Sequence, residues 1–420
     1  DIVFGDWSSD VCSSDLRNDF FYYWTFLISG IIFSLVCILS QKLYEVISGD
    51  QEKLPVVGLV IALEWHLMWA TNSGMETILF ILLILTLFLY MVVEKKYSYL
   101  ISGILIGIII FVRPDGITLL GPLFFILFYR KMIEKKKIIN PFVLMAVILI
   151  FIAIFGFFNY RLSGEIFPNT FYAKQAEYEI LNNQPILKRI FNLFQIPLTG
   201  AGIILLPGFL YFLYKKIKKF DVYIVSLYLW LFGYLLIYAI RLPVTYQHGR
   251  YLIPIIPAFF LLSRCGYNQL LQNDFPKKKL VVFGGYSAFA TVLIIFFFLG
   301  AKAYGQDVAI IETEMVATAK WVQNNIDEKA TIAAHDIGAL GFYTDRNIID
   351  LAGLINPEVI PFIRDEAKLK EYLDQKNVDF LVVFPGWYEE LDDTKTEIYS
   401  SNGQFSPMLG GENMKIYIWK

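Results

Sequence analysis

The stretch TILFILLILTLFLYMVVEKK, residues 77–96, decides the class of this chain. Its first seventeen residues carry no charge, and one acidic and two basic residues follow them. Because an α-helix rises about 1.5 Å per residue, such a run crosses most of the roughly 30 Å hydrocarbon core of a bilayer. The pattern predicts a transmembrane helix with lysines at its interfacial end.

Similar apolar stretches recur along the chain. The 420 residues are 56% hydrophobic and only 18% charged, whereas soluble domains average about 25% charged residues. We predict a polytopic α-helical membrane domain of about ten spans over residues 17–300, some short enough to be tilted or broken. The net charge of −2 gives no indication of nucleic-acid binding. The stretches fall at about residues 20–39, 55–70, 77–93, 98–112, 116–129, 141–158, 196–214, 222–240, 251–263 and 280–300.

The first sixteen residues, DIVFGDWSSDVCSSDL, differ in character from the rest. They lack a basic segment before an apolar stretch, so they are not a signal peptide. The string WSSDVCSSDL resembles translated sequencing-adapter read-through, and a disordered native Ser/Asp-rich tail is the alternative. We expect a non-native leader over residues 1–16, with one span and one external loop missing upstream of Phe20.

Lysine and arginine predict the orientation of the spans. One set of connections holds seventeen basic residues, among them Arg130–Lys137 and Lys215–Lys219, and the opposite set holds seven. We predict that the first set faces the cytoplasm. Alternation then places residues 301–420 outside it. The segments 71–77, 159–195 and 241–251, together with RPDG (113–116), are predicted to be external as well.

From Lys302 the chain alternates between helical and extended patterns. An amphipathic helix is expected over residues 306–326 and a charged helix near 366–376. TIAAH, NIIDL, DFLVVF and MKIYIW are expected to be strands. We therefore predict a soluble α/β domain over residues 301–420. It contains neither GxGxxG nor a phosphate-binding P-loop sequence.

Two motifs near the predicted external surface carry charge beside apolar runs. In RPDG, Pro114 breaks the helix and Asp115 is positioned to cap the next one. The alternative is that Arg113 and Asp115 face an aqueous cavity, since ionisable residues at membrane depth are costly. In SGMET, Ser73 and Glu76 have capping-box spacing, and a direct role for Glu76 is the alternative.

Two further groups of residues combine polar and apolar side chains. Glu64 and His66 are expected to form a buried contact with each other or with the backbone. In FPNTFYAK, Asn169 and Lys174 are candidates to bind a lipid-linked phosphate, with Phe171 and Tyr172 along its prenyl tail. An interfacial aromatic anchor is the alternative.

QHGRY places a histidine and an arginine at the mouth of a span. Arginine is suited to phosphate, although Arg250 could instead reach toward lipid head groups. Of the tail residues, His335 is expected to be structural, and Asp336 and Asp350 lie in the same string. The basic residues predicted to be external suit an anionic lipid head group: Arg113, Arg161, Lys174, Arg241, His248 and Arg250.

In this order, SGMET, VRPDG, FPNTFYAK, HGRYLIPIIP and IGALGFYTDRNIIDLAGLINPE resemble one family. They are similar to multi-spanning GT-C type glycosyltransferases that use polyprenyl-phosphate sugars. Among these they resemble the actinobacterial terminal arabinofuranosyltransferases and their uncharacterised bacterial relatives. The resemblance covers residues 71 to 360. It implies a polytopic α-helical GT-C fold in the bacterial cytoplasmic membrane, with a C-terminal extracytoplasmic α/β domain.

The resemblance also implies a reaction. A sugar would move from a polyprenyl phosphate to a hydroxyl of a glycan, lipid or protein acceptor of the cell envelope. Cationic side chains would stabilise the departing phosphate, and Arg113, Lys174, His248 and Arg250 are the candidates, with Asp115 beside them in the cavity. Secondary candidates are Glu76, Asn169, Tyr172 and Arg161.

Such enzymes place a general-base carboxylate in their first external loop. No residue before Phe20 matches that loop, so the catalytic base is unassigned and the fragment is expected to be inactive. No cofactor or metal site is predicted, although Glu76 and Asp115 leave a divalent ion open. The alternatives are a lipid-linked saccharide transporter and a membrane sensor with an external ligand-binding domain.

Overall fold

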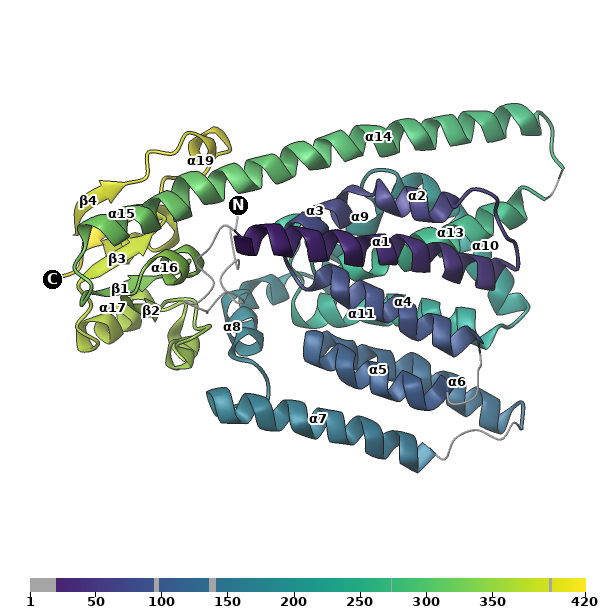
Figure 1. Cartoon of the computed structure of the whole chain (residues 1–420), viewed down its shortest axis with the longest axis horizontal. Helices are drawn as coiled ribbons and strands as arrows, with labels where there is room; N and C mark the ends of the chain where they lie inside the picture. Colours follow the sequence, from purple (N-terminus) through teal and green to yellow (C-terminus); the bar gives the residue numbers. More distant parts are fainter. Residues whose placement is uncertain (1–19, 94–97, 136–140, 273, 393–394) are drawn as a thin grey trace. The chain divides into compact units, whose positions relative to one another are not determined.

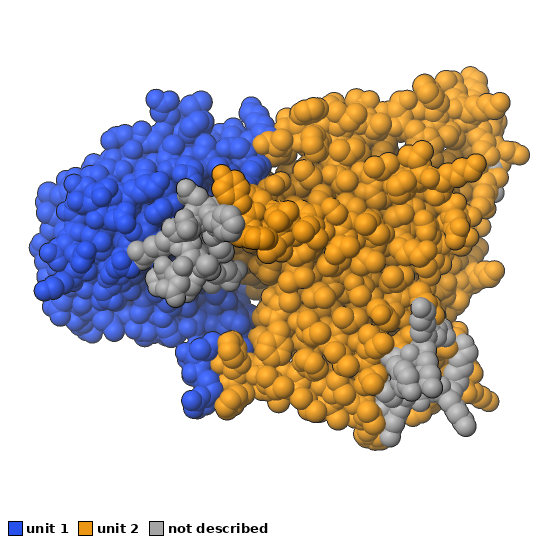
Figure 2. Space-filling model, viewed as in Figure 1, with its two compact units in different colours: residues 1–21, 159–183, 302–420 blue, residues 22–158, 184–301 orange. Residues whose placement is uncertain are grey.

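The computed structural model describes residues 20–93, 98–135, 141–272, 274–392 and 395–420 (Figure 1). The leader predicted at residues 1–16 lies outside the described residues. The chain divides into two compact units, coloured separately in Figure 2. Unit 1 contains residues 159–183 and 302–420 together with the chain as far as Phe21, and unit 2 contains residues 22–158 and 184–301.

Unit 2 is built of helices. Four helical runs among the described residues are long and apolar enough to cross a membrane: Tyr22–Ser48, Phe142–Ser163, Val222–Arg241 and Lys278–Asn325. The helices that lie wholly or partly in unit 2 are α1 (Phe20–Ser48), α2 (Val56–Ala62), α3 (Trp65–Asn72), α4 (Thr77–Val93), α5 (Ser98–Val112), η2 (Pro114–Leu119), α6 (Leu120–Met132), α7 (Pro141–Ser163), α9 (Ile186–Leu198), α10 (Gly202–Lys218), α11 (Val222–Arg241), α12 (Tyr246–Gly249), η4 (Ile253–Ile255), α13 (Ile256–Leu270) and α14 (Lys278–Ile310).

All ten apolar stretches overlap described helices, but many of these are short or interrupted. The stretch 55–70 is split between α2 and α3, because the helix stops before Glu64. Helices α9 and α10 meet at a bend of 107° and could together make a fifth crossing. Helices α4 and α5, with 17 and 15 residues, are shorter apolar helices. The number of membrane crossings therefore stays a prediction.

Helices α10 and α13 approach each other closely at two glycines. A Cβ placed on Gly266 would lie 1.9 Å from the carbonyl oxygen of Gly208, so neither position accommodates a side chain without separating the helices. Small residues permit this kind of approach in membrane helix pairs. The Tyr267 hydroxyl adds a bond by donating to the carbonyl oxygen of Ile204 over 2.5 Å.

Replacing Gly266 by valine is expected to destabilise unit 2 by at least about 3 kcal/mol, because the clash is with backbone rather than with a movable side chain. The measurement is thermal unfolding of the purified protein in detergent. Gly233 on α11 supplies the matched control, since a Cβ there meets nothing within 4 Å. Its replacement by alanine should change stability by less than about 1 kcal/mol. Equal loss in both variants would contradict the close contact.

Unit 1 contains a five-stranded sheet in the order β2-β1-β3-β5-β4. Strands β2, β1 and β3 are parallel, while β5 runs antiparallel to β3 and to β4. The prediction of strands at TIAAH, NIIDL, DFLVVF and MKIYIW is confirmed. The strands are β1 (Thr331–Ala334), β2 (Asn347–Asp350), β3 (Phe380–Val383), β4 (Thr396–Ser400) and β5 (Lys415–Ile418).

Both faces of this sheet are covered by helices. Side chains alternate along each strand, so Leu381 and Val382 belong to different cores. Helix α17 (Glu366–Gln375), with η6 (Pro357–Phe362) and α18 (Glu389–Asp392), covers one face, and α15 (Ala317–Asn325) with α16 (Gly338–Tyr343) covers the other. The chain also contains η7 (Pro385–Trp387) and α19 (Phe405–Met408).

Three predictions of local structure need correction. The helix expected over residues 306–326 is the end of a longer run, in which α14 continues through the π-helix η5 (Ile311–Val316) into α15. The segment 159–195 was expected to connect two spans, but much of it is helical: α7 extends to Ser163, and α8 (Asn169–Glu177), η3 (Glu179–Asn183) and α9 follow. Strand β4 was not predicted, and α16 follows β1.

Candidate functional site

Arg113 lies at the centre of a hydrogen-bonded cluster in unit 2. It follows α5, and Pro114 starts the short helix η2, so the chain turns where the arginine stands. The guanidinium donates from Nε to Asp115 Oδ1 over 3.1 Å and from Nη2 to Asp115 Oδ2 over 3.0 Å. Nη1 donates to Glu76 Oε1 over 3.1 Å. Two carboxylates from separate segments therefore hold one nearly buried cation.

Two tyrosines of α11 complete the environment of Asp115. The hydroxyls of Tyr234 and Tyr238 donate to Asp115 Oδ2 over 2.5 and 2.6 Å. They stand four residues apart and so share one face of the helix. Neither tyrosine was predicted from the sequence. The available signal was this spacing, because a tyrosine inside an apolar helix needs a partner for its hydroxyl.

A second arginine reaches the same region through Tyr251. The Tyr251 ring stacks against Tyr238 with centroids 5.4 Å apart. The guanidinium carbons of Arg113 and Arg250 lie 5.6 and 5.0 Å from its centroid. Arg250 also donates to Gln247 Oε1 over 2.8 Å. We call this set the arginine–tyrosine cluster, and it consists of Glu76, Arg113, Asp115, Tyr234, Tyr238, Arg250 and Tyr251.

Neither capping prediction is correct, and the reason is the same at both positions. Asp115 makes no cap bond in η2, since its oxygens accept from Arg113 and the two tyrosines. Ser73 ends α3 and donates to the carbonyl oxygen of Ala70, while Glu76 accepts from Arg113. Charge pairing in a buried setting outweighs the local capping preference at these sites.

The prediction for Glu64 and His66 is confirmed. Glu64 Oε1 lies 2.7 Å from His66 Nδ1, and Oε2 accepts from the backbone N–H of Leu67 over 2.9 Å. Glu64 is thus the N-cap of α3.

His248, predicted beside Arg250, stands in a strained turn. Its φ is 55° and that of Gln247 is 49°, in the left-handed region that few non-glycine residues occupy. The imidazole packs edge-on against Trp65 and Trp69, with ring centroids 5.5 and 5.0 Å away. Backbone strain of this kind costs of order 1–3 kcal/mol and often marks a functional segment.

The cluster combines two guanidinium groups, two carboxylates and three phenols. Its formal charges cancel, so it is polar without a large net charge. Glu76 is its most accessible charged side chain at 30% exposure, against 7% for Arg113. Within the described residues no three potential metal ligands gather, and Glu76 and Asp115 both bond Arg113 instead. The arrangement therefore suits an anionic ligand better than a cationic one, because an anion can compete with the carboxylates for the guanidinium groups.

A different cluster contains Lys174 in unit 1. Lys174 is 5% exposed, and its Nζ lies 3.0 Å from Glu177 Oε2 within α8. Glu177 Oε1 lies 3.9 Å from His335 Nε2, and His335 Nδ1 lies 2.7 Å from the Tyr388 hydroxyl. Burial raises the pKa of Tyr388 well above its ordinary value, so this hydroxyl stays protonated. His335 is therefore part of an ordered polar network, as a structural residue would be.

This network lies where the parallel strands of unit 1 end. His335 follows β1 and Tyr388 follows the turn after β3, and β1 and β3 are neighbours. In open α/β sheets the crevice at the carboxyl ends of neighbouring strands is the usual ligand position. Here α8 contributes Glu177 and Lys174 to that position.

FPNTFYAK and NIIDLAGL, two strings far apart in sequence, meet in unit 1. Asn169 Nδ2 donates to the carbonyl oxygen of Leu354 over 3.3 Å, and Ala173 packs with Ala352 and Leu354. Asp350 organises this loop because its carboxylate accepts from three backbone N–H groups, those of Ala352, Leu354 and Ile355.

Replacing Asp350 by alanine is expected to destabilise unit 1 by about 3 kcal/mol, since two buried donors and one partly buried donor lose their acceptor. Hydrogen exchange of the amides at residues 351–356 should rise accordingly. Asp350→Asn, which keeps one oxygen, should lose less than half as much stability. Unchanged protection in the alanine variant would contradict the assigned role.

The predicted site residues therefore fall into two groups. Arg113, Asp115, Glu76 and Arg250 belong to the arginine–tyrosine cluster, and His248 is close to it in the chain. Unit 1 contains the other candidates. Lys174 pairs with Glu177, and Asn169 donates to Leu354. Tyr172 packs among Phe167 and Phe171, and Arg161 is exposed near the end of α7.

Comparison with solved structures identifies the fold. The crystal structure of ArnT from Cupriavidus metallidurans in the apo state matches with a TM-score of 0.55 and 10% sequence identity. The match covers 95% of this chain and 87% of that one. ArnT is a GT-C glycosyltransferase that uses a lipid-linked sugar donor. The chain has a GT-C-like helical membrane fold.

Sequence comparisons add one match. A family model described as "Domain of unknown function (DUF8728)" matches residues 305–417, which lie in unit 1. No curated protein matches the chain.

Proposed function

We propose that this protein is a membrane glycosyltransferase that takes its sugar from a polyprenyl-phosphate donor. The observation that carries the proposal is the GT-C-like fold, which extends over 95% of the chain. The arginine–tyrosine cluster adds a chemical reason, because it collects two arginines beside one ring in a membrane protein. Ionisable residues in such a setting are costly and usually mark a site.

In this proposal the donor phosphate lies at the arginine–tyrosine cluster. Arg250 and Arg113 supply positive charge to the phosphate as the bond to the sugar breaks, which stabilises the leaving group. Asp115, Tyr234 and Tyr238 hold the Arg113 guanidinium in place, so little reorganisation is required during the reaction. Arg113 thereby supplies positive charge and also holds Glu76 and Asp115 in position.

The remaining parts follow from the predicted topology. From the excess of lysine and arginine on one side, we expect the cluster and unit 1 to lie outside the cytoplasm. The acceptor would be a hydroxyl group of the cell envelope, which attacks the anomeric carbon of the sugar. We assign no general base, because both carboxylates of the cluster bond Arg113.

Donor binding is therefore the direct test, since it requires no base. The protein in nanodiscs is mixed with radiolabelled polyprenyl-phosphate sugar, and bound label is measured. We expect saturable binding that unlabelled polyprenyl phosphate displaces and polyprenol, which lacks the phosphate, does not. Release of labelled sugar to an envelope extract would extend the result to transfer.

A transporter would give a different result. In sealed vesicles it would move the lipid-linked saccharide across the membrane without breaking the sugar–phosphate bond. Absence of saturable binding, or displacement by polyprenol as strong as by polyprenyl phosphate, would refute the proposed donor site.

A further inference from the structure

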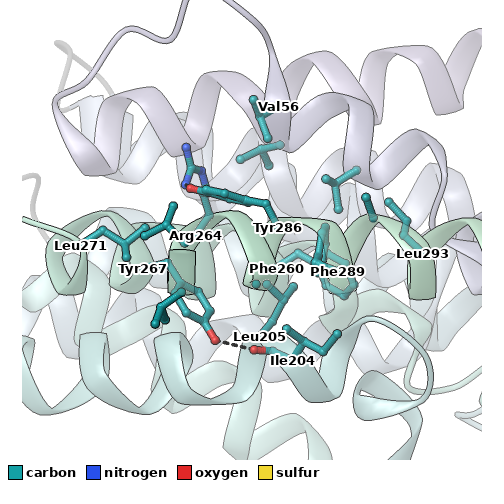
Figure 3. Close-up of a pocket in the computed structure, with 16 residues that line it drawn as sticks. Val56, Ile204, Leu205, Phe260, Arg264, Tyr267, Leu271, Tyr286, Phe289 and Leu293 are labelled. Carbon is teal, nitrogen blue, oxygen red and sulfur yellow. Dashed lines mark hydrogen bonds between the residues drawn. The ribbon is translucent and has the colours of Figure 1, made fainter. Parts of the chain in front are cut away.

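Unit 2 contains an apolar pocket of about 520 Å³ between α2, α10, α13 and α14 (Figure 3). Its volume is in the range of pockets that bind small molecules. The lining is almost entirely aliphatic and aromatic, and includes Leu205, Phe260, Phe289 and Leu293. An apolar pocket between membrane helices suits a hydrocarbon chain.

One cation interrupts this apolar lining. Arg264 of α13 and Tyr286 of α14 lie together toward the Leu271 end of the pocket, with Leu293 at the opposite end (Figure 3). Arg264 Nη1 donates to the Tyr286 hydroxyl over 3.0 Å, and Nη2 donates to Glu52 Oε1 over 2.6 Å. The pocket thus has an apolar body and a charged end, as an amphiphilic ligand requires.

This charged end is not the arginine–tyrosine cluster. Arg250 and Tyr251 precede α13, whereas Arg264 lies eight residues beyond the start of that helix, or roughly 12 Å along its axis. Tyr267 and Leu271, which also line the pocket, lie further still in the same direction. A donor phosphate bound at the cluster and a head group bound at Arg264 would therefore occupy separate positions.

The chain around the Arg264 end is strongly basic. The segments 215–221 and 264–279, which end α10 and connect α13 to α14, contain eight basic and two acidic residues. Lys215 and Asn268 line a neighbouring polar pocket, so the two segments come together there. Basic segments at a membrane surface attract anionic lipids by about 1 kcal/mol per residue.

We infer that this pocket binds one chain of an anionic membrane phospholipid, whose phosphate lies against Arg264 and Tyr286. The apolar lining accounts for the chain and the basic end for the negative charge. The occupant is distinct from the proposed donor, because Arg250 precedes α13 whereas Arg264 lies eight residues into that helix. The inference does not depend on the proposed function.

Two pairs of variants test the chain and the head group separately. A Cβ on Gly285, which lines the pocket, meets nothing within 4 Å, and the same is true of Gly284, which does not line it. Gly285→Phe should fill the pocket, and Gly284→Phe is its matched control. Arg264→Gln removes the cation, and its control, Lys131→Gln, removes an exposed lysine of α6 that lies outside both basic segments.

The measurement is native mass spectrometry of the full chain, delipidated in detergent and then mixed with phosphatidylglycerol, phosphatidylcholine or polyprenyl phosphate. We expect one retained phosphatidylglycerol per protein, with at least about tenfold weaker retention in Arg264→Gln and in Gly285→Phe. Both control variants should retain it as the unmodified protein does.

Equal retention of phosphatidylcholine, or displacement of phosphatidylglycerol by polyprenyl phosphate, would overturn the inference. So would unchanged retention in Gly285→Phe, whose Cβ meets nothing within 4 Å and whose ring has the pocket volume to occupy. Failure of polyprenyl phosphate to bind anywhere would bear on the proposed function alone.

Discussion

Replacing Arg113 by leucine is expected to destabilise unit 2 by about 3–5 kcal/mol, because it leaves Glu76 and Asp115 without their cation. The side chains of the three residues are 7%, 30% and 14% exposed, so water compensates only in part. The measurement is thermal unfolding in detergent, together with the amount of protein that accumulates in membranes. Asp115 would also be left with only its two tyrosine donors.

Arg113→Lys separates charge from geometry. Lysine keeps the positive charge but cannot bond Asp115 and Glu76 in the same planar arrangement, so it should recover part of the loss. Arg241→Leu, at the exposed end of α11, is the matched control and should change stability by less than about 0.5 kcal/mol. If Arg113→Leu were as stable as that control, the cluster would have no structural role.

The second large effect is expected on donor binding. Replacing Arg250 by glutamine should weaken the binding of polyprenyl phosphate at least about tenfold, because hydrogen bonds to a charged group contribute about 1.5–3 kcal/mol. Binding to nanodisc-embedded protein is the measurement, with thermal stability followed in parallel. Arg250 is mostly buried, and therefore both quantities are needed.

Arg250→Lys is the informative companion, since lysine binds phosphate as a point charge. It should recover much of the binding lost in the glutamine variant. Lys131→Gln, in the exposed last turn of α6, should bind polyprenyl phosphate unchanged. Equal binding by the Arg250→Gln variant and the unmodified protein would exclude Arg250 from the donor site.

The sequence predicted the membrane helices and the C-terminal sheet well for a physical reason. Long apolar runs have few alternatives in a helical membrane protein, and the four predicted strands are short apolar runs bounded by turns. Strand β4 was not predicted, because TEIYS is mostly exposed at the edge of the sheet and lacks a continuous apolar run. Its contacts with β5 depend on partners distant in sequence.

The sequence identified four of the seven residues of the arginine–tyrosine cluster. Arg113, Asp115, Glu76 and Arg250 stood out because a charge beside an apolar run is conspicuous. Their mutual contacts connect residues up to 37 positions apart, and those to Tyr234 and Tyr238 more than a hundred, so no local pattern shows them. The capping predictions for Asp115 and Glu76 were wrong for this reason, because the residues that bond them are mostly distant in the sequence.

Lys174 has a local partner that the prediction of a phosphate ligand did not include. A basic residue in an aromatic, membrane-facing string suggested a phosphate ligand. In unit 1 its ammonium group pairs with Glu177 and lies 5.6 Å from the centre of the Tyr178 ring. The spacing of three residues between Lys174 and Glu177 on a helix is itself a known pairing signal. Its role in the donor site stays a prediction.

The central claim is that polyprenyl phosphate binds at the arginine–tyrosine cluster, and photo-crosslinking tests it most directly. A polyprenyl phosphate with a photoreactive group next to the phosphate is bound to the protein in nanodiscs, irradiated and mapped by peptide sequencing. The account predicts crosslinks within residues 71–77, 113–119 or 244–252. Crosslinks confined to residues 260–293, or none above those formed by a photoreactive polyprenol, would contradict it.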